Sequence, residues 1–280
     1  MMKLVLVKKT LIFMMFILAL PVNAVFSSEL IFTAPPRESA QAGNKIYQPV
    51  AKYLSQLLNR KVTYKHPGNW FNYQSKMRKD KYDIIFDGPH FTSWRIAHLK
   101  YDVLVKLPSE LQFMVVTDAN NFVIDSGKDV TGKRFCGISP PNLSSLSFLA
   151  TFNNPMLQPR VIGIKGSMQD VYNAFEKEKC SAAVLRNVFY EKKLPRDKRD
   201  KLKIIFKSPE MPNQAISVSS RLSQKEKSKI TNALLEGAGK KSLNGIVKRF
   251  SGAAMRPFVR TNNVEYEGYN KYLEGVIFGW

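Results

Sequence analysis

The sequence predicts an α/β protein with two lobes, each a mostly parallel sheet flanked by helices. Short apolar segments typical of buried strands alternate with longer segments whose apolar residues recur at helical spacing. The alternation occurs in two successive runs, and no linker rich in Gly, Ser or Pro separates them. We therefore expect lobes joined by strands that cross between them near residues 108–117 and 211–219, with a ligand cleft between the lobes.

The first run supplies lobe 1, residues 25–110, which a C-terminal part of about residues 220–280 completes. Its expected strands are residues 29–34, 61–66, 82–86 and 101–107, and its expected helices are residues 44–60, 71–79 and 90–99. The helix over 44–60 has the clearest pattern, because Ile46, Val50 and Leu54 recur on one face.

The second run supplies lobe 2, residues 111–215. Its expected strands are residues 112–118, 132–138, 158–164, 180–185 and 202–206, and its expected helices are residues 143–154 and 167–179. A strand over 213–219 then leads back to lobe 1, where we expect a helix over 223–237 and a largely helical segment over 245–276.

The first 24 residues have the pattern of a secretory signal peptide. A basic stretch over residues 1–9 precedes an apolar stretch over residues 10–20, and Val22 and Ala24 occupy the −3 and −1 positions of a cleavage site. The apolar stretch is far shorter than the roughly 20 residues of a membrane-spanning helix. We therefore expect export to the periplasm, with cleavage near Ala24.

The formal net charge of the 280 residues is +21, and +18 remains for a chain cleaved near Ala24, because the removed segment holds three lysines and no acid. Such a charge favours a small anionic ligand, an anionic membrane surface or nucleic acid. The most basic stretch, residues 192–207, contains a single aromatic residue, Phe206, whereas nucleic-acid-binding modules interleave basic and aromatic residues. We expect a solvated surface there and no nucleic-acid partner.

The chain has two cysteines, Cys136 and Cys180. In an oxidising compartment such a pair favours a disulfide, and two buried free thiols on apolar strands are the alternative.

Patterns of catalytic or metal sites are missing from the sequence. It has no G-x-S-x-G motif, and its three histidines, His66, His90 and His98, share no metal-binding spacing. Residues 236–242, EGAGKKS, lack the first Gly and the final Ser or Thr of a phosphate-binding loop, and fit the end of a helix better. We expect no enzymatic activity, no metal and no cofactor.

Polar clusters instead follow the expected strands, and the carboxyl ends of the strands of such a fold face one cleft. A helix beginning after Pro140-Pro141 would offer free N–H groups and hydroxyls to an anion, although capping alone explains each serine taken singly. Tyr47 and Trp70 fit the core or a helix face better, and are included only as candidate walls of the cleft. The candidate ligand-binding residues are Arg37, Ser39, Tyr47, Trp70, Asp87, Gly88, Pro89, His90, Asn142, Ser144, Ser145, Ser167 and Arg186.

Several of these loops, in their order and spacing, resemble one known family. The segments YDIIFDGPHFTSW, PPNLSSLSFLATFNNP, GSMQDVYNAFEKEKCSAAVLRN and SPEMPNQAISV are similar to those of the periplasmic phosphate-, phosphite- and phosphonate-binding proteins of ABC transporters, over roughly residues 30–235. The resemblance implies a type II periplasmic binding protein fold, whose lobes close over a ligand. It also implies that Ser144 and Ser145 contact the anionic group, with the turn at residues 87–90 opposite.

Arg186 departs from the family pattern. Phosphonate-binding members usually present a carboxylate at this position, which meets an amine or a protonated oxygen. Arginine there implies a ligand that is more fully ionised or that carries a carboxylate.

The function that the sequence favours is an exported, monomeric solute-binding protein, which captures a small phosphate-, phosphite- or phosphonate-like anion and delivers it to an ABC transporter permease. A subunit that presents its ligand to a membrane sensor is an alternative within the same class. An enzyme on the same fold, such as a pyrimidine synthase, and a secreted binder of polyanions are two further hypotheses. The signal sequence and the lack of a catalytic cluster weigh against the enzyme.

Overall fold

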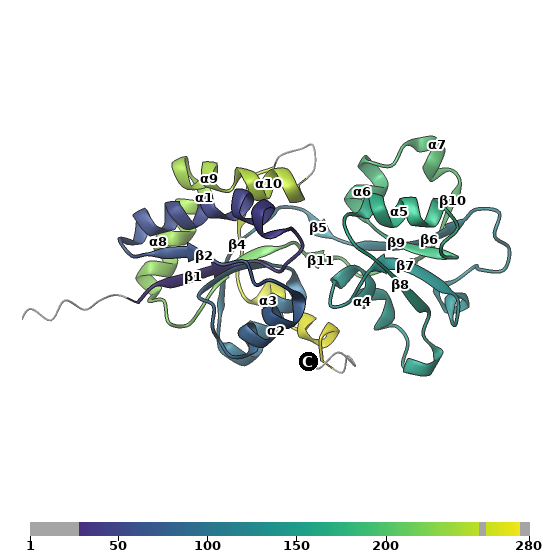
Figure 1. Ribbon diagram of the computed structural model, residues 1–280, viewed down its shortest axis with the longest axis horizontal. Helices are drawn as coiled ribbons and strands as arrows, with labels where there is room; N and C mark the ends of the chain where they lie inside the picture. The colour runs from purple at the N-terminus through teal and green to yellow at the C-terminus, as the bar shows by residue number, and fades with distance from the viewer. Residues whose placement is uncertain (1–27, 252–255, 275–280) are drawn as a thin grey trace, which may run out of the picture.

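The computed structural model describes residues 28–251 and 256–274, and these residues form two α/β lobes, as expected (Figure 1). The proposed signal peptide and its cleavage site lie outside the described residues. One lobe contains a six-stranded sheet in the order β13-β4-β12-β3-β1-β2, and the other a five-stranded sheet in the order β10-β6-β9-β7-β8. Between the lobes, β5 (Glu110–Leu111) pairs with β11 (Met211–Pro212) in an antiparallel ribbon.

Lobe 1 packs helices on both faces of its sheet. Its strands are β1 (Leu30–Thr33), β2 (Val62–Tyr64), β3 (Ile84–Asp87), β4 (Asp102–Lys106), β12 (Ala215–Val218) and β13 (Val259–Arg260). Its helices are α1 (Ala40–Leu58), α2 (Trp70–Arg78), α3 (Pro89–Leu99), α8 (Gln224–Leu235), α9 (Gly237–Ser242) and α10 (Asn244–Phe250). Residues 237–242 thus form a separate short helix rather than the end of the one before it.

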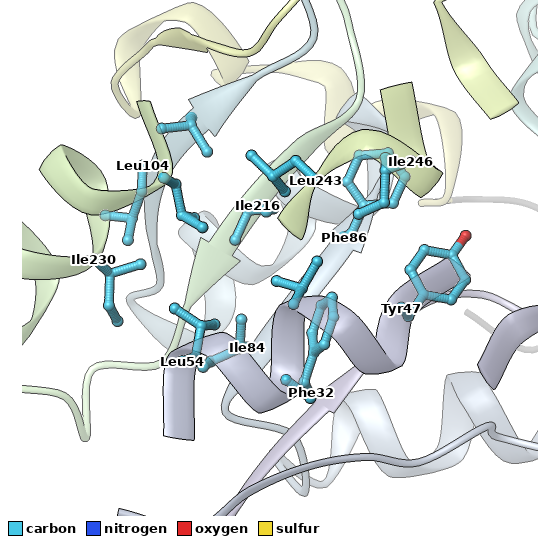
Figure 2. Packing of buried hydrophobic residues seen from close by; sticks show 14 of the residues in the cluster. Phe32, Tyr47, Leu54, Ile84, Phe86, Leu104, Ile216, Ile230, Leu243 and Ile246 are labelled. Carbon is cyan, nitrogen blue, oxygen red and sulfur yellow. The ribbon is translucent and has the colours of Figure 1, made fainter. Parts of the chain in front are cut away.

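Alternation along β3 explains how both faces are filled. Ile84 and Phe86 pack in one cluster with α1, α8 and α10, whereas Ile85 packs on the other face with α2 and α3. Figure 2 shows the first cluster, in which Leu54 of α1 and Ile230 of α8 lie over the strands. The three consecutive buried residues of β3 therefore serve two helical layers, as expected of a central strand.

Lobe 2 has the same layered construction with shorter helices. Its strands are β6 (Phe113–Asp118), β7 (Arg134–Ile138), β8 (Arg160–Ile164), β9 (Ala182–Arg186) and β10 (Leu202–Lys207). Its helices are α4 (Leu143–Leu149), α5 (Met168–Glu176), α6 (Asn187–Lys192) and α7 (Arg196–Arg199), with 3-10 turns at Gly127–Val130 and Pro155–Leu157. The sequence analysis did not anticipate α6 and α7, and α4 ends five residues earlier than the segment 143–154 suggested.

Each sheet is mixed, with most of its strands running in one direction, as expected. In lobe 1, β1 runs parallel to β2 and β3, but β12 is antiparallel to β3 and β4. In lobe 2, β7 runs parallel to β8 and β9, but β6 is antiparallel to β9 and β10. The antiparallel strands β6 and β12 directly follow β5 and β11 in the chain, so each enters its lobe from the ribbon between the lobes. Because a buried strand has the same apolar pattern in either direction, the sequence did not predict this reversal.

The C-terminal segment differs from the expected helix. Residues 264–266 and 269–272 form two 3-10 turns, separated by Gly268 at a φ of +79°. This left-handed conformation does not fit within an α-helix. The segment packs along α3, where the Asn270 amide donates to Ser93 Oγ at 2.9 Å.

The cysteine prediction is confirmed, because Cys136 and Cys180 form a disulfide that joins β7 to the residues just before β9. Closing a loop of 44 residues restricts the unfolded chain. We expect the Cys136→Ser/Cys180→Ser variant to lose about 2–4 kcal/mol of unfolding free energy. Urea denaturation under oxidising conditions measures this loss. A difference below about 0.5 kcal/mol would contradict the chain-entropy argument.

Candidate anion-binding site

A cavity of about 820 Å³ is lined by residues of both lobes. Lobe 1 contributes the loop after β1, the first residues of α2 and α3, and the end of α10. Lobe 2 contributes the segments after β7, β8 and β9, and Leu111 and Gln214 come from the region between the lobes. Most of the lining therefore follows the carboxyl ends of strands, where ligands of open α/β sheets bind.

The structure places about half of the candidate residues in this lining. The candidates that line the cavity are Arg37, Trp70, Gly88, His90, Asn142, Ser167 and Arg186. The candidates that do not line it are Ser39, Tyr47, Asp87, Pro89, Ser144 and Ser145.

Three guanidinium groups surround Phe250 at one side of the cavity. The guanidinium carbons of Arg37 and Arg249 lie 5.5 and 4.9 Å from the centre of the Phe250 ring. Arg186 Nη1 donates to the Phe250 carbonyl at 3.4 Å, and its Nη2 donates to Asn213 Oδ1 at 3.1 Å. Arg186, at the end of β9, thus reaches across to lobe 1.

This arrangement concentrates positive charge. Burial, and then the neighbouring charges of Arg37 and Arg249, lower the pKa of Arg186 to about 10. Among the described residues, neither Arg37 nor Arg186 has a carboxylate partner, and Arg249 meets Glu38 Oε1 at 3.2 Å. An anion between Arg37 and Arg186 would relieve their repulsion, which makes this pair the electrostatic centre of the site.

Polar atoms without a protein partner also gather here. Arg37 Nη1, His90 Nδ1, Arg186 Nε and Gln214 Oε1 are buried and make no hydrogen bond within the described part of the chain. All four residues line the cavity. Each such atom costs roughly 1–3 kcal/mol, so a polar ligand together with its bound water would stabilise this wall.

His90 is a buried neutral base in the wall formed by α3. Its Nε2 lies 3.0 Å from the Pro141 carbonyl of lobe 2, and its ring lies 4.1 Å from that of Phe91. Burial lowers its pKa to about 4, although the Pro141 carbonyl acts in the opposite direction. Near neutral pH, Nε2 therefore carries the proton that it donates to Pro141, and Nδ1 is left as an acceptor.

The pKa of His90 predicts a pH dependence of stability. An unfolded histidine titrates near 6.5, so between that pH and about 4 the unfolded chain binds a proton that the folded chain does not. The free energy of unfolding should fall by roughly 2 kcal/mol from about pH 7 to about pH 4.5 through this residue alone. Urea denaturation of wild type and His90→Gln across this pH range measures the contribution of His90 to the fall in unfolding free energy, which the variant should lack. Equal pH slopes in the two proteins would contradict the assignment.

Asp87 lies behind the cavity wall and is fully buried. Arg95 Nη1 and Nη2 donate to its two carboxylate oxygens at 2.7 and 2.8 Å, Thr92 Oγ1 donates at 2.9 Å, and the Tyr73 hydroxyl also donates. Burial alone would raise the pKa of Asp87, but the charge and hydrogen bonds of Arg95 outweigh it and lower that pKa. The carboxylate therefore anchors the turn that presents Gly88 and His90.

Ser144 and Ser145 are fully buried, with hydroxyls that already have protein partners. Ser144 Oγ donates to Asn142 Oδ1 at 2.8 Å, and Ser145 Oγ donates to the Ile138 carbonyl at 2.6 Å. Asn142 Oδ1 also accepts from the Ser144 amide, so it caps α4. At this helix mouth, the cap residue is therefore the one that lines the cavity.

The other candidates have structural contacts as well. Ser39 caps α1, and Ser167, although it lines the cavity, forms a reciprocal cap with Asp170 at the start of α5. Tyr47 is buried in the core of lobe 1, where its hydroxyl donates to Glu38 at 3.2 Å. Trp70 is half-buried and stacks on Phe91, with ring centres 6.0 Å apart.

Several lining residues were missed by the sequence analysis. Lys165 stands inside the loop IKGSMQD, so its position after a strand was a usable signal. Arg249 and Phe250 lie at the end of α10, and only tertiary packing brings that helix to the cavity. Gln214 belongs to the crossover between the lobes, where strand patterning gives no indication of a site.

Within the described residues, no group of three or more His, Cys, Asp or Glu side chains has the arrangement of a metal site. Among the same residues, no helix combines the length and apolar character needed to cross a membrane.

A comparison with protein families identifies one family, and a comparison with solved structures shows the fold. Residues 32–266 match the family described as the periplasmic substrate-binding protein of the phosphonate ABC transporter. No curated protein sequence matches the chain.

Solved structures with the same two-lobe fold include a binding protein component of a phosphonate ABC transporter from Pseudomonas aeruginosa. Its sequence is 19% identical, its TM-score is 0.59, and the alignment covers 85% of this chain and 83% of that one. PhnD1 from Prochlorococcus marinus in complex with methylphosphonate has 16% identity and a TM-score of 0.62, with 87% and 96% covered. A Xanthomonas citri protein bound to ATP has 12% identity and a TM-score of 0.67, with 88% and 96% covered. Similarity at these identities establishes the fold.

Proposed function

The chain belongs to the family of periplasmic substrate-binding proteins of phosphonate ABC transporters, and from this premise we propose that it captures its ligand between Arg37 and Arg186. As a family member it is a solute-binding protein of the periplasm, and the family is one of transport proteins rather than enzymes. The ligand class that we propose is a small, fully ionised anion of the phosphonate, phosphite or phosphate type.

The observation that carries this proposal is the pair of guanidinium groups without an acidic partner in a cavity between two lobes. Both side chains are partly buried and line the cavity, and each has one buried nitrogen, Arg37 Nη1 and Arg186 Nε, without a hydrogen-bond partner among the described residues. Arginine binds tetrahedral anions with several charge-assisted hydrogen bonds, each worth roughly 1.5–3 kcal/mol. An anion held by both side chains would also relieve the electrostatic repulsion that lowers the pKa of Arg186.

The side chains of Arg186 and His90 indicate the charge of the ligand. Arg186 favours an ionised group, because a guanidinium binds anions through charge-assisted hydrogen bonds. Neutral His90, with Nδ1 as an acceptor, is the wall group best suited to a ligand N–H or O–H.

The proposed partner is the permease of an ABC transporter, because the family description names a transporter and not a sensor system. We propose that the two lobes close over the ligand, with β5 and β11 as the hinge, and that the closed form docks on the permease.

Calorimetric titration of the exported protein tests this function. The probes are methylphosphonate, which PhnD1 of Prochlorococcus marinus holds, and then phosphite, phosphate, sulfate and acetate at one fixed salt concentration. We expect one class to bind at one site per chain with a dissociation constant at or below the micromolar range, about 8 kcal/mol of binding free energy. Binding of none of these anions would contradict the proposal.

A further inference from the structure

The cavity lining carries more positive charge than one small anion needs. Its cationic side chains are Arg37, Lys165, Arg186, Lys193 and Arg249, and none of the described residues that line it is Asp or Glu. Within residues 28–251 and 256–274, Arg249 alone of these five meets a carboxylate, on Glu38 outside the lining. The other four cationic side chains line the cavity without an acidic partner in that part of the chain.

The two lysines of this set lie in a different part of the lining from Arg37 and Arg186. Lys165 follows β8 and Lys193 follows α6, both in lobe 2, and both are exposed. Neither ammonium has a hydrogen bond or ion pair within the described residues. Two other lysines of lobe 2 form ion pairs, Lys198 with Glu176 and Lys203 with Asp125. Arg37 and Arg186 are partly buried, so the lining has an inner and an outer cationic group.

Apolar side chains of lobe 2 line the same cavity. Met168 of α5, and Val188 and Phe189 of α6, are among them. A ligand that reaches both cationic groups would therefore also meet apolar surface in lobe 2, as expected for a carbon chain or ring.

The volume of the cavity also indicates a ligand with an organic group. A volume of about 820 Å³ lies within the range of roughly 300–1,000 Å³ of pockets that hold small organic molecules. Methylphosphonate has one carbon, one phosphorus and three oxygens, and fills only a small part of that space. The cavity thus accommodates an organic group attached to the anion.

From this arrangement we infer that the physiological ligand is an organic anion with two separate anionic groups. Arg37 and Arg186 bind the phosphonate-type group, and Lys165 and Lys193 bind a second group, such as a carboxylate or a further phosphate. This inference rests on the proposed function and adds to it the class of ligand and the residues that select that class.

A matched pair of ligands tests the second anionic group. In 3-phosphonopropionate and its neutral amide, 3-phosphonopropionamide, the phosphonate and the carbon chain are the same, and one negative charge differs. We expect calorimetry to give about tenfold tighter binding of the acid, because its carboxylate would form ion pairs with two ammonium groups and the neutral amide would not.

Lys165→Gln/Lys193→Gln should remove the preference for the acid and leave methylphosphonate affinity within about twofold of wild type. The control Lys177→Gln/Lys179→Gln removes two exposed charges from the same lobe, outside the lining, and should keep the preference. Melting curves of both variants check that the fold is intact.

The possible failures are distinguishable. In one outcome, wild type binds methylphosphonate through Arg186 but binds the acid and the amide equally. Lys165 and Lys193 then do not bind a second anionic group, and the proposed function stands. A preference for the acid that survives loss of both lysines would overturn their role. If no phosphonate binds, both the proposed function and this inference are wrong.

Discussion

Arg186→Met should weaken binding of the anion selected by titration at least 100-fold and leave the fold intact. The guanidinium has no acidic partner in the described residues, so its loss removes charge-assisted hydrogen bonds to the ligand without stranding a protein carboxylate. Two such bonds are worth roughly 3 kcal/mol at the low end, which corresponds to more than 100-fold in affinity.

The stability of the empty protein separates this role from a structural one. Burial and the charges of Arg37 and Arg249 lower the pKa of Arg186, so the folded state disfavours its charge relative to the unfolded state. Removal of this disfavoured charge offsets the loss of the hydrogen bonds to the Phe250 carbonyl and Asn213, so Arg186→Met should unfold within about 1 kcal/mol of wild type. The control is Arg196→Met, because the Arg196 side chain is 88% exposed on lobe 2 and its loss should change neither property. A variant that binds normally, or one that is strongly destabilised, would contradict the role given to Arg186.

Asp87→Ala should lose about 3–5 kcal/mol of unfolding free energy, because it leaves the fully buried Arg95 without its counter-ion. Arg95 would keep Ser217 Oγ, to which its Nη2 donates at 2.8 Å, and the hydroxyls of Tyr73 and Thr92 would lose their acceptor. Arg95→Met should cost a similar amount for the converse reason. Urea denaturation measures both losses.

The double variant Asp87→Ala/Arg95→Met gives the internal control. Since it removes both charges, it should be more stable than the sum of the two single losses predicts. Strict additivity, or single losses below about 1 kcal/mol, would show that the pair is not the buried ion pair described here.

The elements of the fold followed from local sequence patterns. The apolar run of β3 and the helical repeat of α1 identified a central strand and the helix that covers it. Local pattern did not give the direction of β6 and β12, because pairing partners far along the chain decide it. Nor did it anticipate the left-handed Gly268, which divides the C-terminal segment.

The candidate site followed the sequence in part. Arg37, Gly88 and His90 were found because strand ends are readable and because the ends of several strands meet at one cleft. The sequence does not indicate which side chains bind one another. It therefore did not predict that Arg95 binds Asp87, or that the serine hydroxyls of α4 donate to other protein groups. Arg249 depends on how α10 packs, and its contribution appears only in three dimensions.

Ser144 and Ser145 distinguish two hypotheses about where the anion binds. The family resemblance implies contacts from Ser144 and Ser145 to the anion, whereas in this structure their hydroxyls donate to Asn142 and to the Ile138 carbonyl. Arg37 and Arg186 have the unpartnered donors. The position of the anion therefore decides between the helix mouth and the arginine pair.

A crystal structure of the exported protein with methylphosphonate measures that position directly. The account predicts phosphonate oxygens within hydrogen-bond distance of guanidinium nitrogens of both Arg37 and Arg186. A phosphonate bound by the Ser144 and Ser145 hydroxyls with neither arginine in contact, or bound outside the cavity, would contradict it.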